Sequence, residues 1–238
     1  VLAKMLFKQM RLYKEPARYL STSIARPQSF RKWYQQLWTT KRTNLPPYSH
    51  FTQIGDPVLR DKAAEVPADY VDSKEIRAII DQMVNVLRKY NCVGIAAPQI
   101  GVSLRIIAME FNPNIKKELS DVTWKARQMS ELPLTVFINP QLAVTDYMKH
   151  KHAEGCMSVR GFSGEVERYG GVKLTGLDRK GDDIELELRG WNARIAQHEM
   201  DHLDGKLYID HMDRSTFMCT CWEAVNTKSG RVEIPFYK

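Results

Sequence analysis

Apolar side chains recur at helical spacing after residue 73 and predict a long amphipathic helix. Six of them would form one buried stripe over residues 74–90: Ile76, Ile79, Ile80, Met83, Val84 and Leu87. Ser73 stands just before the stripe, and serine is favoured at the N-cap of a helix. We therefore expect a helix that begins after Ser73 and buries one face.

Further along, short apolar runs predict strands at residues 104–109 (LRIIAM) and 135–139 (TVFIN). The charged residues 113–133 between these runs predict an inserted helix or loop. The stretches VKLTGLD and IELELRG flank the turn RKGDD, which is the pattern of a β-hairpin.

The stretch GWNARIAQHEMDHLDG predicts a second helix, with Asn192 as a candidate N-cap and Gly205 just past its end. Together the elements predict an α+β fold in which a mainly antiparallel sheet wraps around this central helix.

The first 50 residues differ from the rest of the chain in charge. They hold ten Lys and Arg and one acidic residue, Glu15, whereas the later residues hold 25 basic and 27 acidic side chains. Residues 1–20 are also amphipathic at helical spacing, and a basic, amphipathic segment with almost no acids is typical of a mitochondrial presequence. A helix on a membrane surface is the alternative.

We therefore expect a presequence over residues 1–29, a short helix (30–38) and a linker within 30–50, and one folded domain over 51–238. The presequence predicts a location in the mitochondrial matrix. Because the positive charge is concentrated in this terminal segment, direct nucleic acid binding is not indicated. No apolar run is long enough to span a bilayer, and the four cysteines do not form a convincing disulfide framework.

Candidate chemistry lies in the second predicted helix, at QHEMDH (197–202). Residues four apart in a helix share a face, so His198 and His202 can bind one metal ion. Glu199 would lie beside that ion without being a ligand and could act on a water. The alternative for this pattern alone is a surface helix with two ordinary histidines.

A catalytic metal needs a third protein ligand and an open position for water. The candidate ligands downstream of His202 do not fall at a familiar protease spacing, whereas Cys156 stands upstream in EGCMSV (154–159) at an expected strand end. A thiolate with two imidazoles suits iron, zinc or cobalt. Two other functions stay open: an HExxH-type metallopeptidase, and a binding protein whose structural zinc site is closed by Cys219 or Cys221.

Three stretches resemble, in order, the three motifs of peptide deformylases: VGIAAPQIG (93–101), EGCMSV (154–159) and QHEMDHLDG (197–205). The stretches IGDPVLR and FINP are also similar to that family, so the resemblance covers roughly residues 50–213. The N-terminal segment, the insertion and the short C-terminal tail resemble the mitochondrial deformylases of animals most. Three positions depart from the usual pattern: Arg160, where bacterial-type members usually have proline, Cys92 and Met157.

The resemblance implies a hydrolase that removes the formyl group from formylmethionine at the start of newly made, mitochondrially encoded proteins. It implies one divalent ion, with Fe²⁺ favoured over Zn²⁺ or Co²⁺, bound by Cys156, His198 and His202. Glu199 would be the general base, and the Gln99 side-chain amide and the Met157 backbone N–H would stabilise the oxyanion.

Gly94 would contact the substrate through its backbone, although a turn glycine is the alternative. Glu154 and Arg168 are candidates for an ion pair beneath Cys156, and Ile195 is a core position that could also line a pocket for the methionine side chain. The expected partners are N-formylmethionyl nascent peptides. The mitochondrial ribosome and a second copy of the chain, as a homodimer, are further candidates.

Overall fold

The computed structural model describes residues 45–111 and 120–237. The predicted presequence, the short helix at 30–38 and the charged residues 112–119 lie outside the described residues. Hydrogen bonds tie the chain to the domain from Tyr48 onward, where the backbone N–H donates to the Ile100 carbonyl at 2.9 Å. This is three residues before the expected start of the domain.

Five strands form an antiparallel sheet in their sequence order, and a sixth short strand pairs with the fourth. They are β1 (Gly94–Ala96), β2 (Ile106–Phe111), β3 (Leu132–Gly155), β4 (Phe162–Leu177), β5 (Asp183–Arg189) and β6 (Met218–Cys219). The predicted α+β class with antiparallel pairing is confirmed.

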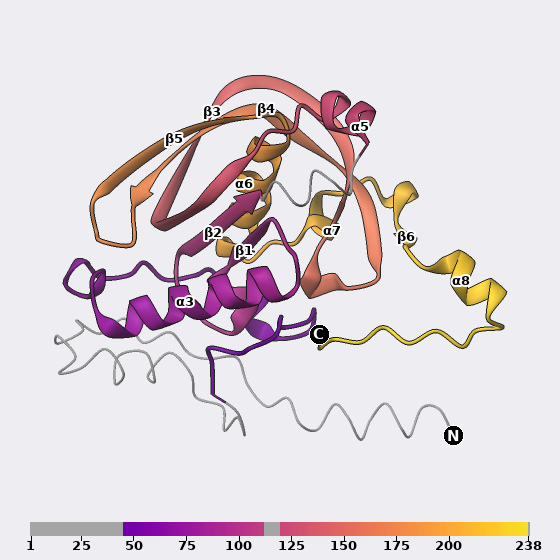
Figure 1. Cartoon of the computed structure of the whole chain (residues 1–238), viewed down its shortest axis with the longest axis horizontal. Coiled ribbons are helices and arrows are strands. Elements are labelled where there is room, and N and C mark those ends of the chain that lie inside the picture. The colour runs from indigo at the N-terminus through magenta and orange to yellow at the C-terminus, as the bar shows by residue number, and fades with distance from the viewer. Residues whose placement is uncertain (1–44, 112–119, 238) are drawn as a thin grey trace. The chain divides into compact units, whose positions relative to one another are not determined.

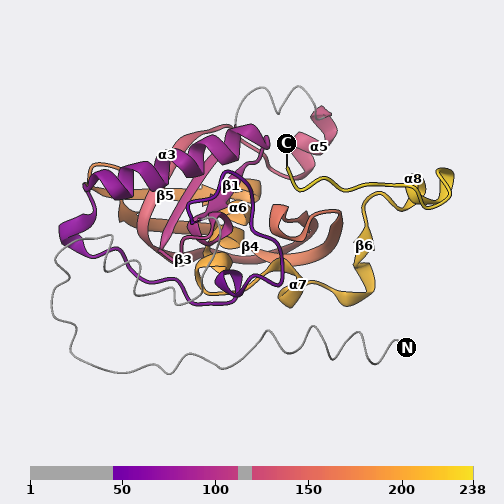
Figure 2. The same cartoon turned by 90° about the horizontal axis from the view of Figure 1, so that it is seen from below.

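The helices are α3 (Lys74–Lys89), α5 (Asp121–Ala126), α6 (Gly190–Leu203), α7 (Tyr208–His211) and α8 (Trp222–Thr227), with short 3₁₀ turns at Pro57–Leu59, Ala68–Tyr70, Ala97–Ile100, Met157–Val159 and Arg214–Thr216. The long strands β3 and β4 curve around α6 (Figure 1), and α6 contacts all of β1 to β5. Helix α3 packs on β1 and β2 (Figure 2). The predicted wrapping of the sheet around one central helix is thus confirmed.

Helix α3 forms as its sequence pattern predicts. The six predicted stripe residues are buried, together with Val86. The Ser73 side chain accepts a hydrogen bond from the Ile76 N–H at 3.2 Å, which satisfies one of the free donors of the first turn.

The predicted strands exist with shifted bounds. The run at 104–109 begins as a strand only at Ile106, because Leu104 instead forms an isolated parallel bridge with Ala64. The run at 135–139 is one part of the much longer β3, whose later residues largely alternate between exposed and partly buried positions. The hairpin prediction is confirmed, since β4 pairs with β5 and Leu177 lies opposite Asp183.

The predicted role of Asn192 as an N-cap is wrong. Helix α6 already begins at Gly190, and Asn192 is buried inside its first turns. Its side-chain amide donates to the backbone carbonyl and the hydroxyl of Ser130, at 3.1 and 2.9 Å. The asparagine therefore ties the helix to the segment before β3. Gly205 does follow the helix end, with a φ of +72°.

In the part of the chain that the structure describes, no helix combines the length and apolar character needed to cross a bilayer.

Candidate active site

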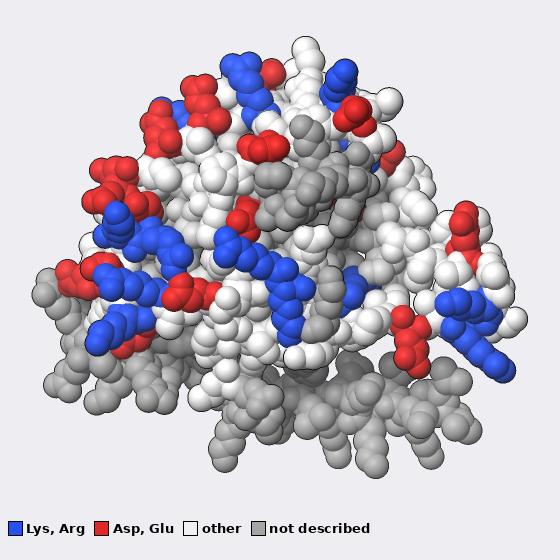
Figure 3. Space-filling view, in the orientation of Figure 1, with Lys and Arg blue, Asp and Glu red and all other residues white. Residues whose placement is uncertain are grey.

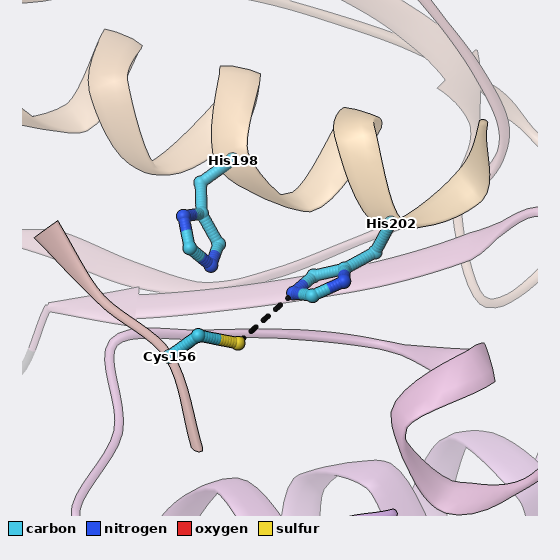
Figure 4. A group of neighbouring side chains, drawn as sticks. All are labelled: Cys156, His198 and His202. Carbon is cyan, nitrogen blue, oxygen red and sulfur yellow. Dashed lines mark hydrogen bonds between the residues drawn. The ribbon is translucent and has the colours of Figure 1, made fainter. Parts of the chain in front are cut away.

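The predicted metal ligands come together although 42 positions separate Cys156 from His198. Cys156 directly follows β3, and the two histidines face it from successive turns of α6 (Figure 4). The Cys156 Sγ and His202 Nε2 atoms are 3.3 Å apart, and the three ligand atoms all lie within 4.8 Å of one another.

This donor set fits a divalent transition metal. In a tetrahedral site with metal–ligand distances of roughly 2.0 to 2.3 Å, neighbouring ligand atoms stand roughly 3.3 to 3.7 Å apart, as the sulfur and the imidazole nitrogen do here. A thiolate and two imidazoles leave one tetrahedral position open, which is the arrangement of a catalytic rather than a structural site.

Glu154 lies beneath these ligands, and its predicted ion pair with Arg168 is confirmed. Both oxygens accept from the Arg168 guanidinium at 3.0 Å, and both residues are buried. Glu154 also accepts from His198 Nδ1 at 3.0 Å, which turns the opposite ring nitrogen toward Cys156. The Nδ1 atom of His202 is buried and has no such partner within the described residues.

The pKa values of this group reflect its pairing. Burial alone would raise the pKa of Glu154, but hydrogen bonds from His198 and Arg168 outweigh it and hold that pKa well below its usual range. Burial would lower the pKa of His198, but hydrogen bonds with Cys156 and Glu154 raise it well above its ordinary value. His202 has no carboxylate hydrogen-bond partner among the described residues, and burial lowers its pKa.

The Gln99 side chain extends from the 3₁₀ turn Ala97–Ile100 toward Cys156. Its side-chain oxygen accepts from the Ala96 N–H at 2.9 Å, while its Nε2 lies 3.2 Å from Ser158 Oγ and 3.5 Å from Cys156 Sγ. The buried amide is thus held with its donor beside the metal ligands.

The Met157 backbone N–H points away from the 3₁₀ turn that follows Cys156. The Cys156 carbonyl accepts from the Val159 N–H at 3.0 Å, inside this turn. In a planar trans peptide the N–H points opposite to the carbonyl, so the Met157 N–H is directed outward. Met157 lines the cleft described below.

Glu199 is 4% exposed, and its Oε2 has no partner among the described residues. Burial raises the pKa of this carboxyl to about 7. Gly94, the first residue of β1, leaves room for it: a Cβ built there would stand 2.3 Å from Glu199 Oε1 and 2.9 Å from Ile195 Cγ2. The reading of Gly94 as a turn glycine is therefore wrong. Gly94 lies in strand β1, and its lack of a side chain leaves space for the Glu199 carboxylate.

These groups share one cleft of about 390 Å³. Cys156, Met157, His198, Glu199, Gln99 and Gly94 all line it, as do the three departures from the family pattern, Cys92, Met157 and Arg160. Apolar side chains line it too, among them Val93, Trp191 and Ile195. Ile195 also belongs to the main hydrophobic core, so it is a core residue that lines the cleft as well.

Sequence reasoning missed two supporting residues. Arg194 Nη1 donates to Glu154 at 2.6 Å and to the Val166 carbonyl at 2.9 Å, and Ser158 accepts from Gln99. A signal for Arg194 was present, because it precedes His198 by the same four positions that separate the two histidines. No local pattern marks Ser158, whose contact depends on the packing of two distant turns.

The fold and the site together define a class of metal-dependent hydrolases. The family model for polypeptide deformylase matches residues 48–217. The chain belongs to the peptide deformylase family.

Similar proteins come from organelles and from bacteria. The human mitochondrial peptide deformylase is 43% identical over 181 residues, which is 76% of this chain and 74% of that protein. The chloroplastic/mitochondrial peptide deformylase 1A of Arabidopsis thaliana is 45% identical over 177 residues, 74% of this chain and 65% of that protein. The crystal structure of the Met-Ala-Ser-bound deformylase of Acinetobacter baumannii has a TM-score of 0.61 at 32% identity, covering 68% of this chain and 96% of that chain.

Proposed function

We propose that this chain removes the formyl group from N-formylmethionine at the start of new polypeptides and releases formate. The observation that carries the proposal is the donor cluster of Cys156, His198 and His202, with Glu199 and Gln99 beside it in one cleft of a deformylase fold. In the reaction, water supplies the oxygen of the new C–O bond, and the formyl C–N bond breaks to leave formate and a free amine.

The residues divide the work as follows. Cys156, His198 and His202 would hold one divalent ion, which supplies Lewis acidity that lowers the pKa of water and polarises a carbonyl oxygen. The carboxylate of Glu199 takes the proton of the attacking water and delivers it to the leaving amine nitrogen. Its raised pKa, about 7, suits a group that must both take and give a proton near neutrality.

Donors in the cleft stabilise the negative charge that develops on the formyl oxygen. We assign this role to the Gln99 Nε2 amide and to the outward-pointing Met157 N–H, both beside Cys156. The backbone of Gly94, in the edge strand β1, binds the peptide chain of the substrate. The apolar part of the cleft, near Val93 and Ile195, receives the methionine side chain.

A formate assay tests the proposal. The chain is loaded anaerobically with Fe²⁺, Zn²⁺ or Co²⁺ in parallel and given formyl-Met-Ala-Ser. We expect formate release with each ion, because a thiolate with two imidazoles accepts all three. We expect the highest rate with Fe²⁺, the ion that the family resemblance favours. Absence of formate with all three ions would overturn the proposed activity, and higher activity with another ion would overturn the choice of iron alone.

The role of Glu199 is tested by Glu199→Ala. We expect the variant to keep one bound ion per chain, since all three ligands remain, and to lose turnover by a factor of about a hundred or more. An unchanged rate would remove Glu199 as the base. Cleavage of internal bonds in an unformylated peptide would instead favour the metallopeptidase alternative.

We further propose that the chain acts in the mitochondrial matrix on mitochondrially encoded proteins, with residues 1–29 as its presequence and the region 51–238 as its catalytic domain. The support is the concentration of ten basic residues in the first 50 and the similarity to a human protein named as mitochondrial. Residues 1–29 fused to a fluorescent protein should direct it to mitochondria. Binding to the mitochondrial ribosome and homodimer formation are lesser proposals, tested by co-sedimentation and by light scattering.

A further inference from the structure

One charged side chain in the cleft has no role in the proposed reaction. Arg160 follows the 3₁₀ turn Met157–Val159, four residues after Cys156, and its side chain lines the cleft with Met157 and Phe162. The residue is half-buried, and its Nη1 atom is shielded from solvent without a hydrogen-bond partner among the described residues.

A guanidinium has five N–H donors and no acceptor, so its N–H groups need acceptors from their surroundings. A shielded N–H that makes no hydrogen bond is costly, and more so when it carries charge. Two other arginines show how the same fold satisfies such groups. Arg168 pairs with Glu154 and Asp201, and Arg194 pairs with Glu154 and two backbone carbonyls.

The two carboxylates that line the cleft do not serve Arg160. Glu154 is already engaged by Arg168, Arg194 and His198. Glu199 accepts no hydrogen bond from Arg160, and no acidic residue of the described ranges forms an ion pair with it. The Nη1 atom of this guanidinium is thus left without an acceptor among the described residues, and the cleft that Arg160 lines is open to a molecule that supplies acceptors.

The backbone around Arg160 is held in place. The Ser158 carbonyl accepts from the Ile54 N–H at 2.8 Å, two residues before Arg160. Gly161 follows with a φ of +90°, and Ile234 packs so closely on it that a Cβ would stand 2.6 Å from Ile234 Cδ1. The backbone that carries the side chain is thus held beside the cleft, so only the side chain itself has to be ordered when it binds a ligand.

We propose that Arg160 binds the substrate downstream of the formylmethionine, by donating to the oxygens of the residues that follow it. These are main-chain carbonyl oxygens in every substrate and a side-chain carboxylate where the peptide has one. The inference rests on the proposed function. An extended peptide advances about 3.3 Å per residue, so its second and third residues pass within reach of a side chain anchored four positions after Cys156.

The planar fork of the guanidinium suits two oxygen acceptors at once, and a carboxylate is bound more strongly than a carbonyl because both partners are charged. Arg160 therefore sets a preference among substrates: acidic residues after the formylmethionine are favoured over basic ones. It acts through binding and leaves the chemical step to the groups around Cys156.

The test uses the metal-loaded full chain and formylated peptides with amidated C-termini, so that no terminal carboxylate imitates a side chain. The substrates are formyl-Met amide, and formyl-Met-Ala-X amide with Ser, Glu or Lys at X. For Arg160→Met we expect KM to rise roughly tenfold for the Ser peptide and more for the Glu peptide, with kcat nearly unchanged. Formyl-Met amide, which lacks the downstream residues, should be hydrolysed as by the unaltered chain.

Arg214→Met is the matched control, because Arg214 is exposed in the 3₁₀ turn 214–216 and does not line the cleft. Arg160→Glu provides a second variant that should prefer the Lys peptide over the Glu peptide. This ratio of kcat/KM values is measured within one enzyme and so does not depend on how much of a variant folds.

Equal losses on formyl-Met amide and on the longer peptides, or an Arg160→Glu variant with an unchanged Glu-to-Lys ratio, would overturn the inference. If the unaltered chain releases no formate from any peptide, the proposed function itself fails, which is a separate and recognisable result.

Discussion

At the scale of single residues, Glu154 links the predicted metal ligand His198 to two buried arginines, Arg168 and Arg194. It is 7% exposed and carries one negative charge against two guanidinium groups and the His198 ring. A buried charge in such a network is satisfied only while every partner remains, so removing one member leaves others unpaired.

Glu154→Gln removes the charge and nearly preserves the shape. We expect the free energy of unfolding to fall by about 3 kcal/mol, because Arg168 and Arg194 lose their buried counter-charge. Metal affinity should also fall by roughly 10- to 100-fold, since His198 loses the carboxylate that orients it. Urea unfolding and competition with a chelator measure the two effects.

The control for this change is Glu185→Gln, at an exposed pair in which Lys173 Nζ lies 2.6 Å from Glu185. There we expect less than about 1 kcal/mol. Equal stabilities of the two variants would show that the Glu154 network does not stabilise the fold.

Gly94 is the second residue on which the site depends. In Gly94→Ala the new Cβ would collide with the Glu199 carboxylate, which has to move. We expect kcat to fall about a hundredfold, because a displacement of about 1 Å is enough to misplace a catalytic group. Metal content should stay at the level of the unaltered chain, since no ligand is touched. A normal kcat would mean that Glu199 works from another position.

At the scale of elements, helix α6 is the part that assembles the site. Its period places Arg194, His198 and His202 on one face, toward β3 and Cys156. Asn192, in its first turn, anchors the helix to Ser130 before β3. The sequence pattern had assigned this residue as the N-cap. The anchoring contact joins residues 62 positions apart, so it belongs to packing rather than to helix ending.

Asn192→Ala tests this anchor. We expect a loss of about 1 kcal/mol in the free energy of unfolding, the net contribution of a typical hydrogen bond, because Ser130 is exposed and water can replace the lost donor. Asn226→Ala, at an exposed position in α8, serves as the matched control and should change stability by less than about 0.5 kcal/mol. The opposite ranking in chemical denaturation would contradict the anchoring role.

At the scale of the whole molecule, the donor cluster does not include the C-terminal cysteines, Cys219 and Cys221. Cys219 ends β6 and Cys221 directly precedes α8, with their Sγ atoms 3.4 Å apart, and the cluster found among the described residues contains neither. The closed structural zinc site considered from sequence would have needed one of them. On the face shown in Figure 3, basic and acidic side chains are interspersed over the described surface, in keeping with the nearly balanced charge after residue 50.

Replacing both Cys219 and Cys221 with serine should therefore leave metal content and formate release unchanged. Cys156→Ser should lose the ion, because a thiolate ligand becomes a hydroxyl that binds such metals poorly. Metal analysis of the two variants side by side decides the matter. Loss of metal in the double variant would restore the closed-site alternative.

What the sequence by itself determined about this protein is local or carried by motifs. The stripe of α3 and the four-residue spacing of His198 and His202 follow from helical period alone, and three motifs in order indicated the family. The hairpin of β4 and β5 followed from a turn between two alternating runs. Each of these patterns is formed by residues that are near one another in the sequence.

Only the tertiary structure decided how the distant parts meet. It brought Cys156 close to His198 and His202 and placed Glu154 beneath them, paired with Arg194 as well as Arg168. It also showed that a side chain at Gly94 would collide with Glu199. It also left the Nη1 atom of Arg160 without a partner among the described residues, beside the cleft. Distances between such residues depend on how the curved sheet packs around α6, and local side-chain patterns encode which face is buried but not which distant group it meets.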